Sequence, residues 1–196
     1  MESFTKIAAV LVIAYLLGSI PTALIVSKRI LHMDIRSIGN GNMGACNTFH
    51  EIGPVFGILV AIIDYLKGAT SVFIAYALGL SLGWQLLAGI FAILGHDFPV
   101  FARFKGGKGV ATSLGTMAVL FPVPAFIGLA VYSVVFLFTR KSIIGLGIGC
   151  GAIALTLGIL HQWVFLEYAI AIFLFIPIKL FIDSPQRKTL LRSSKN

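Results

Sequence analysis

Residues 110–138 read VATSLGTMAVLFPVPAFIGLAVYSVVFLF, and whether they form one helix or two decides the fold of the chain. A single helix of this length would extend roughly 44 Å at 1.5 Å per residue. That exceeds the roughly 30 Å hydrocarbon core of a bilayer. Pro122 and Pro124 interrupt the run, and proline inside a helix removes a hydrogen bond and clashes with the preceding turn. Two helices broken at these prolines would each be short, so length alone does not decide.

Basic residues decide between the two arrangements, because cytosolic loops of membrane proteins are rich in Lys and Arg. With two helices, three loops and the C-terminal tail lie on one side, and Lys6 alone lies on the other. With one helix, Arg140, Lys141 and the tail move to the outer side. The two-helix arrangement places the following basic residues on one side of the membrane: Lys28, Arg29, Arg36, Arg103, Lys105, Lys108, Arg140, Lys141, Arg187, Lys188, Arg192 and Lys195. We therefore predict an all-α polytopic membrane protein with seven transmembrane helices, the N-terminus outside and the C-terminus cytosolic.

The composition agrees with a membrane protein, since 58% of the 196 residues are hydrophobic and 11% are charged. No soluble domain of this size needs so much apolar surface. Besides 110–138, the predicted apolar runs are 4–26, 54–80, 84–101, 143–160 and 163–182, with a kink in the first at Gly18-Ser19-Ile20-Pro21. We predict one integral membrane domain over residues 1–182 and a basic cytosolic tail over 183–196.

The net charge and the cysteines limit the partners that we expect. A net charge of +8 would suit nucleic acid, but in a membrane protein it more often reflects orientation and anionic lipid. We therefore expect a bilayer and no nucleic acid. Cys46 lies in a Gly-rich loop and Cys150 in an apolar run, so a disulfide is not expected. Neither metal-ligand spacing nor another cofactor motif is present, and no cofactor is predicted.

The second Gly-rich loop, residues 104–112, reads FKGGKGVAT. Its glycines allow close approach to backbone N–H groups, two lysines add positive charge, and a helix start follows. This combination predicts a phosphate site at the membrane edge. A basic turn that only fixes the topology is the alternative.

The first Gly-rich loop, residues 34–47, reads DIRSIGNGNMGACN. Glycine and asparagine favour tight turns, and asparagine amides both donate and accept hydrogen bonds. Together with Arg36, the loop predicts a polar concavity that suits anions, although a flexible linker is the alternative. Both loops lie on the cytosolic side in the predicted topology. Their convergence would place Arg36, Lys105 and Lys108 around one phosphate.

Asp64, Lys67 and His96 are ionisable residues that fall within or beside predicted spans. Asp64 and Lys67 are three positions apart on one helix face and can pair. A buried pair that supports the site is favoured over a direct catalytic role. His96 lies at the cytosolic end of its helix, where it is either an acid/base group or phosphate ligand, or an interfacial histidine bonded to backbone.

The motifs of several familiar enzymes are absent. The chain contains neither a GxSxG elbow nor a GxxxxGK[ST] loop, and no His is followed five residues later by Asp. A phosphate site without an obvious nucleophile indicates catalysis by positioning and charge on a pre-activated substrate.

Four segments resemble, in order, the motifs of the bacterial membrane glycerol-3-phosphate acyltransferases called PlsY. They are GSIPTALIVSK (18–28), RSIGNGNMGACN (36–47), DYLKG (64–68) and GHDFPVFARFKGGKGVATSLG (95–115). The resemblance implies transfer of a fatty acyl group from acyl phosphate to the 1-hydroxyl of glycerol 3-phosphate, giving lysophosphatidic acid in phospholipid synthesis. It also implies a multi-pass location in the bacterial inner membrane, with the site facing the cytosol.

The resemblance also implies roles for individual residues. Catalytic roles fall to Lys105, Lys108 and His96. Substrate-binding roles fall to Arg36, Gly39, Asn40, Gly41, Asn42, Gly44, Asn47, His50, Gly106, Gly107, Gly109 and Thr112.

The chain departs from the family pattern at several functional positions. Asn40 replaces the serine, Cys46 the threonine and His50 the arginine of the family's first loop, and residues 179–187 lack the family's His and Asn. These changes leave open a transporter or lipid-handling protein that kept the phosphate pocket and lost the chemistry. Asp64, Lys67 and the broken run at Pro122 favour that alternative. The clustering of charges at one face, and a span number that does not divide into equal repeats, oppose it.

Overall fold

The computed structural model describes residues 3–182, and all regular structure in this range is helical. The elements are α1 (Phe4–Gly18), α2 (Thr22–Ile30), η1 (Ile35–Ser37), α3 (Ala45–Glu51), α4 (Pro54–Ala77), α5 (Leu82–Asp97), η2 (Val100–Ala102), α6 (Val110–Leu120), α7 (Pro122–Thr139), α8 (Ser142–Ile159) and α9 (Trp163–Ile182). The all-α prediction is confirmed. The predicted tail, residues 183–196, lies outside the described residues.

The decisive stretch forms two helices, as predicted. α6 ends at Leu120, and α7 begins with Pro122 in its first turn, a position where the missing N–H of proline costs no helical hydrogen bond. α6 has 11 residues, so it extends about 16 Å and is shorter than the apolar core of a bilayer. Among the described residues, five helical segments are long and apolar enough to cross a membrane: Phe4–Ile30, Pro54–Ala77, Leu82–Ala102, Pro122–Thr139 and Ser142–Ile159. A multi-pass membrane protein is thus supported, while seven spans and their orientation stay predictions.

The first apolar run is interrupted where the kink was predicted. α1 ends at Gly18 and α2 begins at Thr22, with Pro21 directly before it. Since proline cannot donate a backbone hydrogen bond, the helix cannot continue through this position unchanged. The run extends to Ile30, beyond the predicted end at position 26. The first polar loop also contains a short helix, α3, that the polar sequence did not predict.

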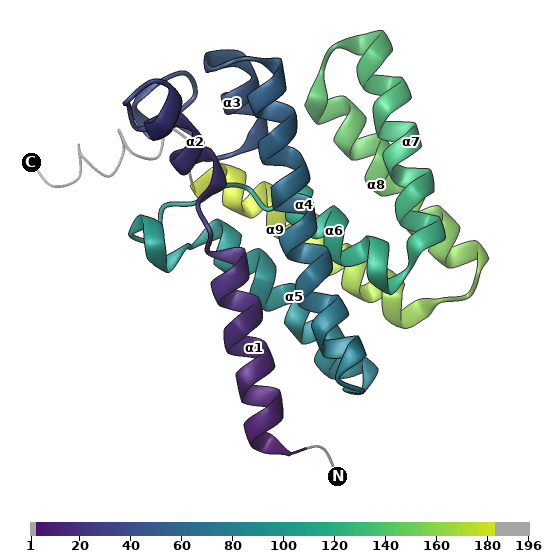
Figure 1. The fold of residues 1–196 in the computed structure, drawn as a ribbon. Coiled ribbons are helices and arrows are strands. Elements are labelled where there is room, and N and C mark those ends of the chain that lie inside the picture. The colour runs from purple at the N-terminus through teal and green to yellow at the C-terminus, as the bar shows by residue number, and fades with distance from the viewer. Residues whose placement is uncertain (1–2, 183–196) are drawn as a thin grey trace, which may run out of the picture.

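Glycines allow the helices to pack closely. A Cβ atom at Gly18 of α1 would overlap the carbonyl oxygen of Ala92 in α5, and one at Gly115 of α6 would overlap that of Tyr65 in α4. Small residues at helix crossings are typical of membrane bundles. Figure 1 shows the resulting arrangement, with α7 and α8 as an antiparallel pair and with α9 passing behind α4 and α6 in this view.

One end of the bundle brings the two Gly-rich loops together. α2 and α3 lie at the end away from the N-terminus in Figure 1. A buried cluster there joins residues from α2, η1, the first loop, α4 and η2: Ala23, Leu24, Ile35, Met43, Val60 and Ala102. This apolar contact fixes the backbone on both sides of the predicted phosphate site.

Candidate active site

The second loop rests on the C-terminal end of α5. The N–H of Gly106 donates to the carbonyl oxygen of Asp97 at 3.2 Å, and the N–H of Gly107 donates to that of His96 at 3.1 Å. A Cβ at Gly106 would overlap the His96 carbonyl oxygen, and one at Gly107 would overlap His96 Nε2. These two glycines are therefore required for packing, and their amides are already bonded. An anion at this loop must use other donors.

The remaining donors lie where the loop enters α6. Gly109 precedes the helix in the left-handed conformation, with φ of 68°, which suits glycine because it has no Cβ. No side chain among the described residues makes a capping hydrogen bond at this helix end, and the N-terminus of a helix favours anions. The buried hydroxyl of Thr112 has no hydrogen-bond partner within the described part of the chain. Lys108 is half-buried beside this turn, and Lys105 is exposed.

The first loop is organised by the side-chain amide of Asn47. Its NH₂ group donates to the carbonyl oxygens of Ile35, Ile38 and Asn42 at 3.1–3.2 Å, and its Oδ1 accepts the N–H of Asn40 at 3.0 Å. Asn47 is only 2% exposed. All the hydrogen-bonding capacity of this amide is thus directed at the loop itself. Asn47 positions the predicted substrate-binding residues around it.

Three glycines shape the same loop. Gly39 and Gly41 have φ of 56° and 71°, the left-handed region that glycine tolerates best. At Gly39 a Cβ would also overlap Asn47 Oδ1. Gly44 is extended and forms the N-cap of α3. The turn chemistry predicted from the Gly/Asn composition is therefore present.

Arg36 connects the two loops. Its guanidinium forms an ion pair of 2.6 Å with Asp34 and donates to the carbonyl oxygen of Ala102 in η2 at 2.9 Å. The side-chain hydrogen bonds from Arg36 hold the pKa of Asp34 below its ordinary value. The same bonds raise the pKa of Arg36. The guanidinium is thereby fixed in orientation, and sequence reasoning missed Asp34 as its partner.

A buried charged cluster lies beneath the second loop. Lys67 Nζ is 2.8 Å from Asp64 Oδ1, which confirms the predicted pair, and Asp64 Oδ1 is 3.7 Å from His96 Nδ1. None of the three residues is more than 6% exposed. Gly107 packs directly on the imidazole of His96. His96 thus supports the second loop from the inside of the bundle. Lys67 also donates to the carbonyl oxygen of Ile20, in the break between α1 and α2, at 3.1 Å.

Lys179 of α9 joins this region, and the sequence reading missed it. It is 3% exposed, and its Nζ lies 4.7 Å from the centroid of the Phe98 ring, within the range of a cation–π contact. The available signal was a single basic residue near the end of a predicted span whose other charged residue is Glu167.

Several predicted residues lie at the edge of the site. Asn40 is exposed, and its Oδ1 accepts the N–H of Asn42 at 3.0 Å. His50 is exposed on α3, where its ring meets that of Phe49 edge-on with centroids 5.6 Å apart. Cys46 is exposed on the same helix. The altered first-loop positions thus lie on the accessible side of this loop.

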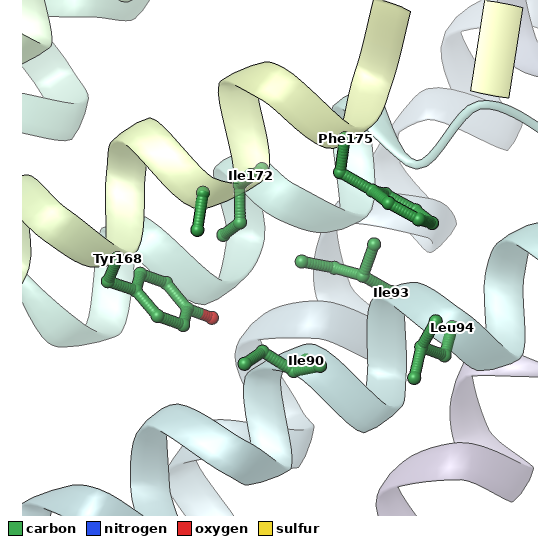
Figure 2. Close-up of a pocket in the computed structure, with 7 residues that line it drawn as sticks. Ile90, Ile93, Leu94, Tyr168, Ile172 and Phe175 are labelled. Atoms are coloured by element: carbon green, nitrogen blue, oxygen red, sulfur yellow. The ribbon is translucent and has the colours of Figure 1, made fainter. Parts of the chain in front are cut away.

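An apolar cavity of about 170 Å³ lies between α5 and α9. Figure 2 shows Ile90, Ile93 and Leu94 facing Tyr168, Ile172 and Phe175 across it. On each helix the cavity lining ends within one turn of a charged or polar residue, His96 on α5 and Lys179 on α9. Apart from the Tyr168 hydroxyl, which donates to Thr116 Oγ1 at 3.4 Å, the lining is apolar and suited to hydrocarbon. Within residues 3–182, no group of three His, Cys, Asp or Glu is placed to hold a metal ion.

Comparison with known proteins agrees with this arrangement. The family model described as glycerol-3-phosphate acyltransferase matches residues 8–184. Glycerol-3-phosphate acyltransferase of Endomicrobium trichonymphae is 43% identical over 147 residues, covering 75% of this chain and 73% of the relative. The protein of that name from Limosilactobacillus reuteri is 40% identical over 162 residues, covering 82% of this chain and 78% of the relative. Other relatives are matched over as little as 53% of their length.

Solved structures extend the similarity to nearly the whole chain. The crystal structure of PlsY (YgiH) in its glycerol 3-phosphate form is 31% identical, with a TM-score of 0.82, covering 97% of this chain and 92% of that one. The lysophosphatidic acid form of that protein is 30% identical, with a TM-score of 0.79, covering 97% and 94%. On the evidence of its sequence and its fold, this chain belongs to the glycerol-3-phosphate acyltransferase family.

Proposed function

We propose that this chain transfers a fatty acyl group from an acyl phosphate to the 1-hydroxyl of glycerol 3-phosphate, giving lysophosphatidic acid and inorganic phosphate. The observation that carries the proposal is the fold, which matches a glycerol 3-phosphate form and a lysophosphatidic acid form of PlsY over 97% of the chain. Both relatives described above are named glycerol-3-phosphate acyltransferase. The site geometry supports the phosphate chemistry that this reaction needs.

The reaction requires little covalent help from the protein. The glycerol oxygen attacks the carbonyl carbon of the mixed anhydride, the bond from that carbon to the phosphate oxygen breaks, and the hydroxyl proton leaves to a phosphate oxygen. Positioned positive charge stabilises the negative charge that develops in the transition state. We propose that Lys108, Lys105 and the uncapped N-terminus of α6 supply it. The buried Thr112 hydroxyl offers one further donor.

The first loop would form the opposite wall of the pocket. Arg36 ties this wall to η2 through its bond to the Ala102 carbonyl oxygen. Asn47 holds the backbone of the wall itself through its bonds to the loop carbonyls. Of the proposed substrate-binding residues in this wall, Gly39, Asn40, Gly41 and His50 are exposed, and Asn42 and Gly44 are half-buried. We propose that substrate approaches this side of the wall. His96 contributes from beneath Gly107 by supporting the loop.

The site is proposed to face the cytosol at the bacterial inner membrane. The basic residues of the loops predict that side by the positive-inside rule, and phosphorylated substrates are found in the cytosol. The acyl donor would arrive through the bilayer, with its phosphate at the edge where both loops lie.

The decisive experiment supplies purified protein in lipid with a long-chain acyl phosphate and glycerol 3-phosphate. Inorganic phosphate and lysophosphatidic acid are measured together, for the wild type, Lys108→Ala and Lys141→Ala. We expect both products from the wild type, loss of both in Lys108→Ala, and full activity in the matched control, because Lys141 lies in the turn before α8. Phosphate release without lysophosphatidic acid would point to another acceptor. Absence of both products, with glycerol 3-phosphate counterflow in proteoliposomes, would favour the transporter alternative.

A further inference from the structure

We infer that Asp64 is a positioning residue that acts on the second loop through His96. The inference rests on the proposed function, since it assigns a partner to the phosphate site. Asp64 lies in α4 and His96 at the end of α5, so the contact joins two helices. It is separate from the phosphate-facing groups, because Asp64 is 2% exposed and covered by the bundle.

Asp64 is paired with Lys67 inside the bundle. A buried carboxylate is costly unless it is paired with an opposite charge and bonded. Lys67 supplies that charge at 2.8 Å, one turn further along α4. The ammonium is itself anchored by its bond to the Ile20 carbonyl oxygen at 3.1 Å. The Asp64 carboxylate is therefore held by Lys67 at a fixed place below the loop.

The Asp64 carboxylate favours one tautomer of the His96 imidazole. Asp64 Oδ1 lies 3.7 Å from His96 Nδ1, longer than a hydrogen bond but close enough for a strong electrostatic preference. A negative oxygen on this side favours the tautomer that carries its proton on Nδ1, which leaves Nε2 as an acceptor. The ring orientation is fixed at the same time.

The other side of the ring carries the loop. Gly107 packs so closely on Nε2 that a Cβ would overlap it, and the Gly107 N–H donates to the His96 carbonyl oxygen at 3.1 Å. Lys108 is the next residue. A change in the tilt of the imidazole thus displaces Gly107 and, with it, the lysine proposed to hold phosphate.

Two roles of the buried pair can be separated. Lys67 stabilises the break between α1 and α2 through Ile20, whereas Asp64 alone faces His96 Nδ1 within the pair. Ser71 is a matched control, because it is buried on α4 one turn beyond Lys67 and, within residues 3–182, its hydroxyl donates to the backbone oxygen of Lys67.

The test compares Asp64→Asn, His96→Gln, the double variant and Ser71→Ala with the wild type. Hydrogen exchange over residues 104–112 reports the loop directly, and kcat and KM for glycerol 3-phosphate report the reaction. We expect Asp64→Asn to speed exchange at Gly106 and Gly107 and to lower kcat by about fivefold or more, a coupling typical of contacting residues. In the His96→Gln background, where the Nδ1 partner is gone, Asp64→Asn should add little. Ser71→Ala should leave both measurements unchanged.

The outcomes separate this inference from the proposed function. Unchanged loop exchange in Asp64→Asn, or an equal effect in the His96→Gln background, overturns the role of Asp64. A wild-type protein that makes no lysophosphatidic acid counts against the proposed function. Hydrogen exchange over residues 104–112 still tests whether Asp64 positions the loop. If Asp64→Asn does not fold, Asp64→Asn with Lys67→Met removes both buried charges together and retains the test.

Discussion

The guanidinium of Arg36 donates a 2.9 Å hydrogen bond to the carbonyl oxygen of Ala102, which lies 66 positions later in the chain. This bond joins the first Gly-rich loop to the short helix that leads into the second. Because Asp34 holds the same guanidinium from the other side at 2.6 Å, its orientation is fixed. The planar guanidinium of Arg36 thus joins the two walls of the proposed phosphate pocket.

Replacing Arg36 by lysine tests this connection. Lysine keeps the charge but lacks the planar fork that bonds Asp34 and Ala102 simultaneously. We expect Arg36→Lys to lower kcat/KM for glycerol 3-phosphate roughly tenfold, in line with the loss of a charged hydrogen bond. Arg29→Lys, an exposed change on α2, is the control. Steady-state lysophosphatidic acid formation is the measurement, and equal rates for both variants would contradict the connection.

The Asp34–Arg36 pair also predicts a dependence on pH. The pKa of Asp34 is lowered by Arg36, so the pair adds stability above the ordinary carboxyl pKa and loses it as the pH falls through the lowered value. We expect the difference in Tm between wild type and Asp34→Asn to be constant between about pH 5 and pH 8. The difference should shrink toward zero as the pH falls below about 4. Since the Asp34 side chain is 34% exposed, the difference should be about 1 kcal/mol or less. Equal Tm values of the two proteins at neutral pH would show that the Asp34–Arg36 pair does not stabilise the fold.

The sequence predicted the helix breaks because proline acts locally. Pro122 and Pro21 interrupt helices by their own geometry, whatever surrounds them, and both breaks are present in the structure. Asp64 and Lys67 were likewise paired correctly, since three positions on one helix bring side chains together.

The partners of the loop residues could not be predicted, because they depend on distant parts of the chain. The amides of Gly106 and Gly107 looked available for an anion, but the end of α5 accepts their hydrogen bonds. Arg36 looked free to bind phosphate, yet Asp34 and Ala102 hold it. Composition identified both loops as special and left the use of each donor undetermined.

Glycine packing between α4 and α6 gives a stability prediction. A Cβ at Gly115 would overlap the carbonyl oxygen of Tyr65, whereas one at Gly147 of α8 would meet nothing within 4 Å. We expect Gly115→Ala to destabilise the bundle by about 1–3 kcal/mol through overpacking. Gly147→Ala should be neutral or stabilising by up to about 1 kcal/mol, because alanine favours the helix. Thermal unfolding of both variants in one detergent is the measurement, and equal Tm values would show that α4 and α6 pack less closely.

Asn47 gives the sharpest contrast within the first loop, because its amide makes four bonds at a site only 2% exposed. Asn47→Asp keeps the oxygen that accepts the Asn40 N–H but removes the donors to three carbonyl oxygens. Leaving buried acceptors unpaired costs about 1–3 kcal/mol, and a buried carboxylate adds to that cost. We therefore expect lower stability, faster proteolysis within residues 34–47 and a raised KM for glycerol 3-phosphate.

The matched control for this change is Asn40→Asp. Asn40 is exposed, and within residues 3–182 its side chain accepts the Asn42 N–H, a role that a carboxylate retains. Stability and loop proteolysis should then stay at wild-type values, although the added negative charge can still weaken phosphate binding. If Asn47→Asp were as stable and as resistant to proteolysis as Asn40→Asp, the buried amide would not organise this loop. The first wall of the pocket would then have to be held by the Arg36 contacts alone.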